Sequence, residues 1–403
     1  MNKLNVLFLT LSSMENINER GIYTDLVREL ASRGIYIHVV FPRERRLGLP
    51  TELEIIDNIK LLKVKTGNIT ETRFIEKGIS TLTIENQYLK AVKKYFGNIN
   101  FDLIIYSTPP ITFERVIQYL KKKHQSKTYL ILKDIFPQNA VDIDILKNNS
   151  FIWKYFRNKE KHLYEVSDMI GCMTKGNVQY ILNHNPYIDR NKVEVFPNSI
   201  EPIDRNNISI INNEIKEKFQ IPAHLTLFIY GGNLGKPQGI DFLIRVAENF
   251  YKIENSYLLI VGSGTEYETI KNYIDSRHPK NVNLIKSLPK KEYDQLLRSA
   301  DVGLIFLDKR FTIPNFPSRL TSYFEYSLPV LAATDKHTDL KNILIESNSG
   351  FWCESGDLDS FIHLAKSLAD NNVLRKQMGL KGRDYLEDNY DIRKTANIIM
   401  KHL

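Results

Sequence analysis

The chain has 403 residues, 42% of them hydrophobic and 25% charged, so it is long enough for two to three domains with sizeable cores. Its two cysteines, Cys172 and Cys353, lie far apart and form no Cys-x-x-Cys pair, which argues against structural disulfides and zinc and fits a reducing cytosol. The formal net charge of +8 belongs to residues 1–200, with 29 Lys and Arg against 21 Asp and Glu, because residues 201–403 hold 26 of each.

A basic half suits an anionic partner, which could be nucleic acid, a membrane or an anionic substrate. The absence of zinc-finger spacing and of RNP-like aromatic motifs argues against nucleic acid. No apolar run approaches the ~20 residues that span a bilayer. The apolar run in Met1–Thr10 is too short for a signal sequence and predicts a first strand.

The first half predicts an α/β domain that begins with a βαβ unit. Apolar runs bounded by turn residues predict strands at Leu4–Thr10, Ile35–Phe41, Phe101–Tyr106, Thr128–Leu132, Met169–Met173 and Val193–Phe196, and helical spacing predicts a helix at Gly21–Arg33. Arg43, Arg45 and Arg46 follow the second strand, at the edge where open α/β sheets bind ligands. A solvated charged loop is the alternative.

Asp134 follows the strand Thr128–Leu132 and is therefore predicted at the carboxyl end of a strand. A carboxylate placed there needs a tuned pKa before it can serve as a base. The alternative is a helix-capping or structural aspartate.

Two Asp-x-Asp pairs could in principle bind a divalent metal through carboxylate oxygens. They are Asp142-Ile-Asp144 and Asp357-Leu-Asp359, and both precede segments that look like helix starts. We interpret both as acidic residues of a first helical turn and predict no metal.

Basic and aromatic residues interleave over residues 151–164, and a similar pattern occupies residues 88–96. Such segments could rest on anionic lipid. Ordinary amphipathic helices explain the pattern equally well.

The segment from Phe196 to Asn213 contains two prolines and an Asn-rich stretch, and it predicts an interdomain linker. A strand at Leu225–Tyr230 then leads into Gly231–Gly239, a turn with four glycines and Lys236, before a helix. Glycines in such a turn allow the backbone to approach an anion. A second turn, Gly262-Ser-Gly264, follows the strand Tyr257–Val261 but lacks the third glycine of the dinucleotide fingerprint.

The stretch from Asn315 to Thr334 carries the strongest signal. It predicts a helix at Arg319–Tyr326 with Ser318 as its N-cap, between the strands Val302–Leu307 and Val330–Ala333. The N–H groups near Leu320 and the Arg319 side chain together suit a diphosphate. Glu325, close to Thr321 on the helix, suits a ribose diol. An ordinary βαβ unit with a surface arginine is the alternative.

The run Pro317-Ser-Arg-Leu-Thr-Ser-Tyr-Phe-Glu-Tyr-Ser-Leu-Pro-Val330 resembles the donor-site motif of retaining glycosyltransferases of family 4, which have the GT-B fold. Glu325 matches the second glutamate of the family's Glu-x7-Glu pattern, and Pro317 stands at the first. This departure, and the Gly-Asn-Leu-Gly-Lys-x-Gln-Gly form of residues 232–239, are similar to the branch of bacterial capsule and O-antigen transferases.

The resemblance implies an α/β GT-B fold with two Rossmann-like domains whose parallel sheets face each other across a cleft. It covers residues 4–400. Residues 1–200 would bind the acceptor and residues 201–384 the nucleotide-sugar, while a helix at residues 385–403 would return to the first domain.

The resemblance also implies site residues. Asn233 and Gln238 fall where the commoner family form has the arginine and lysine that hold the donor phosphates. Asp134 falls in a motif that lies beside the sugar. The implied catalytic residues are Asp134, Lys236 and Arg319; the donor-binding residues are Gly232, Asn233, Gln238, Gly239, Gly262, Gly264, Leu288, Ser318, Leu320, Thr321 and Glu325; the acceptor-binding residues are Glu19, Arg20, Gly21 and Arg43.

The implied activity is that of a retaining, metal-independent hexosyltransferase without a cofactor. Its donor would be a UDP-linked N-acetylated amino sugar such as N-acetyl-fucosamine, and its acceptor an undecaprenyl-diphosphate-linked saccharide of capsule or O-antigen synthesis. The enzyme would be cytoplasmic, at the inner face of the membrane, in peripheral contact with anionic lipid and without a nucleic-acid partner. A GT-B sugar-nucleotide epimerase and a non-catalytic nucleotide-binding scaffold are the alternatives.

Overall fold

The computed structural model describes residues 3–70, 72, 74–207 and 213–403. The chain divides into two compact units. The N-terminal unit comprises Met1–Glu201 and Asp391–Leu403, and the C-terminal unit comprises Pro202–Tyr390. Residues 208–212 of the predicted linker lie outside the described residues.

The N-terminal unit is built on one sheet in the order β3-β4-β2-β1-β5-β6-β7-β8. All neighbouring strands are parallel except β3 and β4, which confirms the α/β prediction. The strands are β1 (Asn5–Leu9), β2 (Tyr36–Glu44), β3 (Glu52–Ile56), β4 (Ile59–Thr66), β5 (Leu103–Ser107), β6 (Lys127–Leu132), β7 (Met169–Cys172) and β8 (Val193–Val195).

The β3–β4 hairpin was not predicted. Its two-residue connection, Asp57-Asn58, places Asp57 at a φ of 51°, and Ile56 pairs with Ile59 across the turn. A two-residue hairpin connection favours this left-handed backbone conformation, which Asp and Asn tolerate better than most residues. The hairpin extends the sheet beyond β2 and adds its antiparallel edge.

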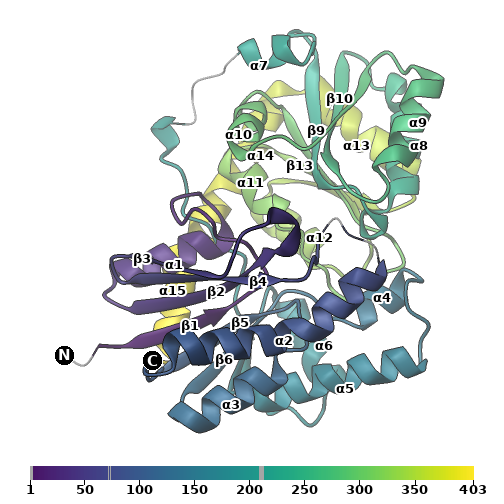
Figure 1. Cartoon of the computed structure of the whole chain (residues 1–403). Helices are drawn as coiled ribbons and strands as arrows, with labels where there is room; N and C mark the ends of the chain where they lie inside the picture. The colour runs from purple at the N-terminus through teal and green to yellow at the C-terminus, as the bar shows by residue number, and fades with distance from the viewer. Residues whose placement is uncertain (1–2, 71, 73, 208–212) are drawn as a thin grey trace. The chain divides into compact units, whose positions relative to one another are not determined.

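Helices cover both faces of the N-terminal sheet, as Figure 1 shows. On one face, Leu26 and Leu30 of α1 pack with Ile392 and Ile399 of α15 against β1. The end of the chain therefore completes the core of the N-terminal unit. The helices are α1 (Ile22–Ser32), α2 (Phe74–Phe96), α3 (Glu114–His124), α4 (Gln138–Asp142), α5 (Phe151–Val166), α6 (Lys175–His184) and α15 (Ile392–Met400), with the short helices η1 (Arg45–Leu47) and η2 (Arg190–Lys192).

The C-terminal unit has a fully parallel sheet in the order β11-β10-β9-β12-β13-β14. Because the strands are parallel, the carboxyl ends of β9, β10 and β12 lie at one edge, where such sheets bind ligands. The strands are β9 (Thr226–Asn233), β10 (Ser256–Ser263), β11 (Val282–Ile285), β12 (Val302–Phe306), β13 (Val330–Thr334) and β14 (Gly350–Glu354).

The core of the C-terminal unit joins Leu243 of α8, Ile270 of α9 and Phe361 of α13 to the sheet. Periodic apolar residues on each helix face the sheet, as amphipathic helices require. The helices are α7 (Asn213–Lys218), α8 (Ile240–Asn249), α9 (Tyr267–Arg277), α10 (Lys290–Arg298), α11 (Arg319–Glu325), α12 (Leu340–Ser347), α13 (Leu358–Asp370) and α14 (Asn372–Asn389), with η3 (Arg205–Asn207), η4 (Lys236–Gln238) and η5 (Phe250–Lys252).

The prediction of one helix from Tyr385 to Leu403 is wrong. Two helices, α14 and α15, occupy this part of the chain, and the break falls at residues 390–391. Asp391 begins α15, since its carboxylate accepts from the Arg393 N–H at 2.8 Å, and the Ile392 N–H donates to the Ile200 carbonyl. The Asp391 cap and this backbone hydrogen bond separate α15 from α14.

In the part of the chain that the structure describes, no helix combines the length and apolar character needed to cross a bilayer.

Candidate functional site

The strand β9 continues three residues beyond its predicted end. Gly231, Gly232 and Asn233 pair with Val261–Ser263 of β10, and the glycines make this approach possible. A Cβ atom on Gly262 would lie 2.0 Å from the Gly232 carbonyl oxygen. A Cβ atom on Gly264 would lie 2.3 Å from the Leu234 carbonyl oxygen. Gly262 and Gly264 therefore let the two strand ends pack backbone against backbone.

The part of the predicted glycine turn that follows β9 contains the short helix η4. The Gln238 side-chain oxygen accepts from the Gly235 N–H at 3.1 Å and from Asn233 Nδ2 at 3.0 Å. Gly239 follows with a φ of 59°, and a Cβ atom there would lie 3.1 Å from the Leu307 carbonyl oxygen. Asn233 and Gln238 thus bond to each other and shape the turn, while the side chain of Lys236 is exposed at its surface.

The start of α11 differs from the prediction of open backbone amides. The Leu320 N–H donates to the Pro317 carbonyl, and the Thr321 N–H donates to the Ser318 carbonyl, each at 3.2 Å. The Ser318 side chain makes no capping hydrogen bond, and its backbone is already helical. These i to i+3 bonds tighten the first turn and use the amides that the sequence left open. Of the groups predicted to bind a diphosphate here, the Leu320 and Thr321 amides are thus engaged, and the Arg319 side chain remains.

Arg319 lies against the glycine-containing end of β9. A Cβ atom on Gly232 would lie 3.3 Å from Arg319 Nη2, and the guanidinium carbon lies 4.5 Å from the centroid of the Tyr230 ring. Arg319 Nη1 is buried and has no hydrogen-bond partner among the described residues. Within those residues, no carboxylate forms an ion pair with Arg319. The structure thus brings together two predicted donor-site residues, Gly232 and Arg319, with a cation available for an anion.

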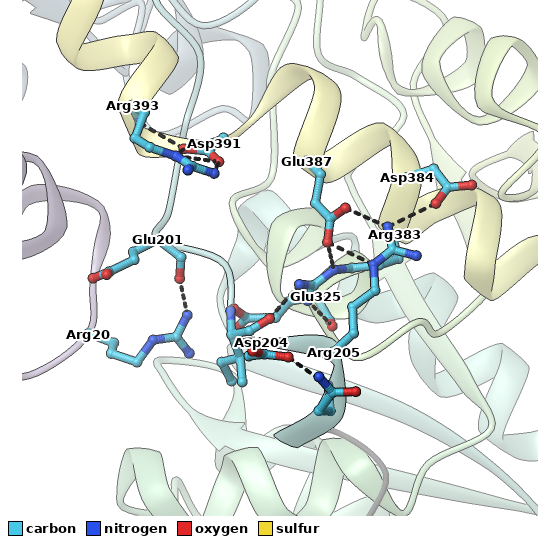
Figure 2. Close-up of polar contacts among 12 residues, drawn as sticks. Arg20, Glu201, Asp204, Arg205, Glu325, Arg383, Asp384, Glu387, Asp391 and Arg393 are labelled. Carbon is cyan, nitrogen blue, oxygen red and sulfur yellow. Dashed lines mark hydrogen bonds and ion pairs between the residues drawn. The ribbon is translucent and has the colours of Figure 1, made fainter.

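Glu325, the predicted ribose-binding residue, is only 2% exposed. Its carboxylate accepts from the Ile203 N–H at 2.9 Å, and its backbone carbonyl accepts from Arg383 Nη1 at 2.8 Å. Arg383 also pairs with Glu387, which binds Arg205 as well (Figure 2). Glu325 therefore helps to attach the part of the predicted linker around Ile203 to the C-terminal core, and its role toward a ribose stays a prediction.

The loop after β11 lies beside the end of β10. The Ser287 hydroxyl donates to the Ser263 hydroxyl at 2.8 Å, which places the neighbouring Leu288 near the same sheet edge as the glycine turns. Thr321 is buried, and its hydroxyl donates to the Ser318 carbonyl at 2.8 Å. The role of Leu288 toward the donor stays a prediction, whereas the Thr321 hydroxyl is engaged within α11.

In the N-terminal unit, Asp134 follows β6 and does not cap a helix. The helix α4 begins at Gln138 after Pro137 and has no side-chain cap. The Asp134 N–H donates to the Thr108 hydroxyl at 3.3 Å, while the carboxylate has no hydrogen-bond partner among the described residues. Burial raises the pKa of the Asp134 carboxyl to about 6, and the Lys133 ammonium opposes the rise. A carboxylate with such a pKa changes charge just below neutral pH, as a general base requires.

Lys133, next to Asp134, is a further candidate site residue that was not predicted from the sequence. Its Nζ donates to the Asn198 side-chain oxygen and lies 5.9 Å from the centroid of the Tyr23 ring. Burial lowers the pKa of Lys133 to about 7, and the charge of Asp134 opposes this shift. The sequence pattern that could have identified Lys133 is its position directly after an apolar strand and next to Asp134.

The predicted acceptor residues near the first helix are engaged in local contacts. Arg20 Nη2 donates to the Glu201 carbonyl, and the Gly21 N–H donates to Asp25 Oδ1 at 3.0 Å. Glu19 is exposed in the same loop, and its N–H donates to the Asn16 carbonyl. The structure brings Glu19, Arg20 and Gly21 together before α1, and their role toward an acceptor stays a prediction.

Arg43 lies inside β2 rather than after it, because β2 pairs with β4 as far as Glu44. Its side chain is 4% exposed and forms ion pairs with Glu15 at 3.1 Å and Glu52 at 2.9 Å. A buried arginine held by two carboxylates has little charge left for another anion. Its predicted contact with an acceptor is not tested by these bonds and stays a prediction.

The two Asp-x-Asp pairs occupy different positions. Asp357 begins α13 and accepts from the Ser360 N–H, which confirms its assignment to a helix start. Asp142 is instead the last residue of α4, where its carboxylate accepts from Gln138 Nε2 at 2.7 Å. The first-turn interpretation of Asp142 is therefore wrong, because α4 begins at Gln138 and ends at Asp142.

Comparison with known proteins agrees with this geometry. Residues 211–385 match the family described as "Glycosyl transferases group 1". The probable glycosyltransferase WbjE of Pseudomonas aeruginosa is 22% identical over 381 residues, covering 93% of this chain and 91% of that protein.

Solved structures show the fold. Sucrose-phosphate synthase of Thermosynechococcus elongatus is similar with a TM-score of 0.77, at 14% identity over 99% of this chain and 98% of that chain. HepE of Anabaena, in complex with UDP and glucose, has a TM-score of 0.68, at 11% identity over 99% and 98%. WaaG, a glycosyltransferase involved in lipopolysaccharide biosynthesis, has a TM-score of 0.65, at 14% identity over 98% and 99%. The two α/β units and their parallel sheets match the GT-B fold of these structures.

Proposed function

We propose that this protein is a retaining, metal-independent glycosyltransferase that moves a sugar from a UDP-sugar to a lipid-diphosphate-linked saccharide at the inner face of the cytoplasmic membrane. The observation that carries the proposal is the position of Arg319 against Gly232, with no carboxylate partner among the described residues. A nucleotide-sugar supplies the diphosphate that such a cation would bind. UDP and glucose in the similar HepE structure support this choice of donor.

Negative charge builds on the diphosphate as the bond to the sugar breaks. Arg319, and Lys236 at the exposed turn, would stabilise that charge electrostatically without a metal ion. The sugar would pass through an oxocarbenium-like state. Asp134 would accept the proton of the attacking hydroxyl, which its pKa of about 6 permits at neutral pH.

The branch motifs at residues 232–239 and 317–330 support a role in capsule or O-antigen synthesis. Within that role, a UDP-linked N-acetylated amino sugar such as N-acetyl-fucosamine is the proposed donor. Undecaprenyl diphosphate carrying a saccharide is the proposed acceptor, since the basic charge of residues 1–200 suits an anionic lipid.

The deciding experiment incubates the protein with radiolabelled UDP-sugars and saccharide-linked lipid diphosphate. Transfer of label to lipid with unchanged anomeric configuration supports the proposal. Label found only in a new free nucleotide-sugar would identify an epimerase instead. Donor cleavage that disappears in EDTA and returns with Mn²⁺ would contradict metal independence.

An exposed apolar patch on the N-terminal unit supports contact with the membrane. At the start of α5, the side chains of Phe151, Ile152 and Tyr155 are 93%, 59% and 45% exposed, and Ile145 before the helix is 53% exposed. The exposed Lys154 stands among them. Apolar side chains beside a cation suit the interface of an anionic bilayer.

This contact has its own test, with vesicles of phosphatidylglycerol and phosphatidylcholine. We expect Phe151→Asp with Ile152→Asp to reduce vesicle binding at least tenfold, because each change removes apolar burial and adds repulsion. Tyr251→Asp, at a residue of the C-terminal unit that is 68% exposed, is the matched control. Equal binding of all three proteins would rule out this patch.

A further inference from the structure

Arg319 lies among tyrosines, whereas arginines in protein interiors are usually paired with carboxylates. The guanidinium carbon lies 4.5 Å from the centroid of the Tyr230 ring, and Tyr293 and Tyr323 lie near the same group. We call Tyr230, Tyr293 and Tyr323 the tyrosine cluster. A carboxylate would hold Arg319 but also neutralise it, whereas an aromatic face holds a cation and leaves its charge for another anion.

Tyr230 contacts both parts of the proposed diphosphate site. Its ring faces Arg319, and its hydroxyl donates to the Asn233 carbonyl at 2.8 Å. This hydrogen bond spans Gly231 and Gly232, the two residues between Tyr230 and Asn233. One side chain therefore fixes both the shape of the glycine-containing strand end and the direction of the guanidinium.

Tyr323 fixes α11 relative to the sheet. Its hydroxyl donates to the Leu304 carbonyl at 3.1 Å and accepts from the Gly231 N–H at 3.3 Å. Burial raises the pKa of Tyr323 to about 12, so the hydroxyl stays protonated at neutral pH. Because Tyr323 lies four residues after Arg319, one helical turn along α11, these bonds set the place from which Arg319 extends.

The glycines of the two strands make room for these rings. A Cβ atom on Gly231 would lie 1.8 Å from the Tyr293 hydroxyl, and a Cβ atom on Gly303 would lie 2.5 Å from the Tyr323 ring. Gly231 thus leaves space for the Tyr293 ring, whereas Gly232 faces Arg319. Gly232 is itself exposed, and Arg319 is partly exposed.

We propose that Tyr230 is a positioning residue for the donor diphosphate: it holds Arg319 without neutralising it and joins the guanidinium to the end of β9, so that both contact the same diphosphate. This inference rests on the proposed function and deepens it, because it assigns diphosphate recognition to a residue that does not touch the donor. Tyr293 and Tyr323 support the arrangement from α10 and α11.

The test measures the affinity of UDP by calorimetry in the full-length protein. Tyr230→Leu removes the aromatic face, and we expect about tenfold weaker UDP binding. Tyr230→Phe keeps the face and loses the hydroxyl, and we expect it to recover most of that affinity. Tyr257→Leu, at a buried tyrosine near the start of β10, controls for the loss of a tyrosine from the same sheet.

A double-mutant cycle separates positioning from a general structural effect. In an Arg319→Ala background, we expect Tyr230→Leu to weaken UDP binding less than twofold further, because its effect passes through Arg319. Equal weakening in both backgrounds, or no weakening by Tyr230→Leu while Arg319→Ala loses affinity, would overturn the inference and leave the proposed function standing. Failure of the unmodified protein to bind UDP, GDP or dTDP would overturn the proposed function itself. If Tyr230→Leu does not fold, Tyr230→Phe and Tyr230→Trp replace it in the cycle, because both keep an aromatic face toward Arg319. If adding Arg319→Ala to either variant left its UDP affinity unchanged, the inference would be rejected.

Discussion

At the end of β9, a permanently charged arginine lies among tyrosines, whereas at the ends of β5 and β6 a lysine and an aspartate lie next to each other among hydroxyls and an amide. The first cluster contains Arg319, whose charge does not change in the physiological pH range. The second contains Lys133 and Asp134, whose pKa values burial moves to about 7 and about 6. In the proposed reaction, Arg319 would bind an anion at constant charge, whereas Asp134 would accept a proton.

The largest expected effect comes from removing the permanent charge. We expect Arg319→Ala to reduce donor turnover by about 10² to 10³-fold, the loss typical for one stabilising donor at a developing negative charge. Arg319→Lys should recover part of this rate, because the ammonium keeps the charge but not the planar fork. The measurement is sugar transfer at saturating acceptor. A rate within threefold of the unmodified protein would show that Arg319 is only structural.

The second effect concerns the titrating carboxyl. We expect transfer by the unmodified protein to fall as the pH is lowered through about 6, because protonated Asp134 cannot accept a proton. Asp134→Asn should reduce transfer about 10²-fold at pH 7.5, within the usual range for a general base. Asp144→Asn, at an exposed residue near the same unit's α4, serves as control. UDP affinity should remain unchanged in Asp134→Asn, and a matching loss of affinity would contradict the division between the units.

The smallest effect tests the coupling between the lysine and the aspartate. The positive charge of Lys133 opposes the rise in the pKa of Asp134, so Lys133→Met should raise that pKa further. The acidic limb of the rate profile should then move to higher pH by about half a unit to one unit. Lys127→Met, at the exposed start of the same strand, should leave the limb in place. A shift to lower pH would show that another group controls the limb.

The sequence predicted most of the strands and the general position of the donor site. Apolar runs found β9, β10, β12 and β13, because buried parallel strands are nearly continuous in apolar residues. The strands β3, β4 and β14 were not predicted; they lie at or next to sheet edges and carry polar residues. The glycine turn was predicted to start at Gly231, but β9 continues to Asn233, because its last residues pair with β10.

The candidate residues divide in the same way. Residue type and position, together with the family resemblance, selected Arg319, Lys236 and Asp134, since charged residues after predicted strands are visible in the sequence. They did not reveal Tyr230 or Lys133, whose importance lies in the groups they face. The amides near Leu320 were expected to be open, yet short-range bonds within the turn use them.

By itself, the sequence determined the class of both domains, the charge difference between the two halves and the arginine and glycines suited to a diphosphate. These properties are local, because they follow from apolar periodicity, charge and the backbone freedom of glycine. Only the tertiary structure decided that tyrosines surround Arg319, that Glu325 binds the Ile203 N–H, and that the chain's last helix completes the N-terminal core. The contacts of Tyr230 with Arg319, of Ile203 with Glu325 and of α15 with β1 join residues far apart in the chain, so spacing along the sequence does not reveal them.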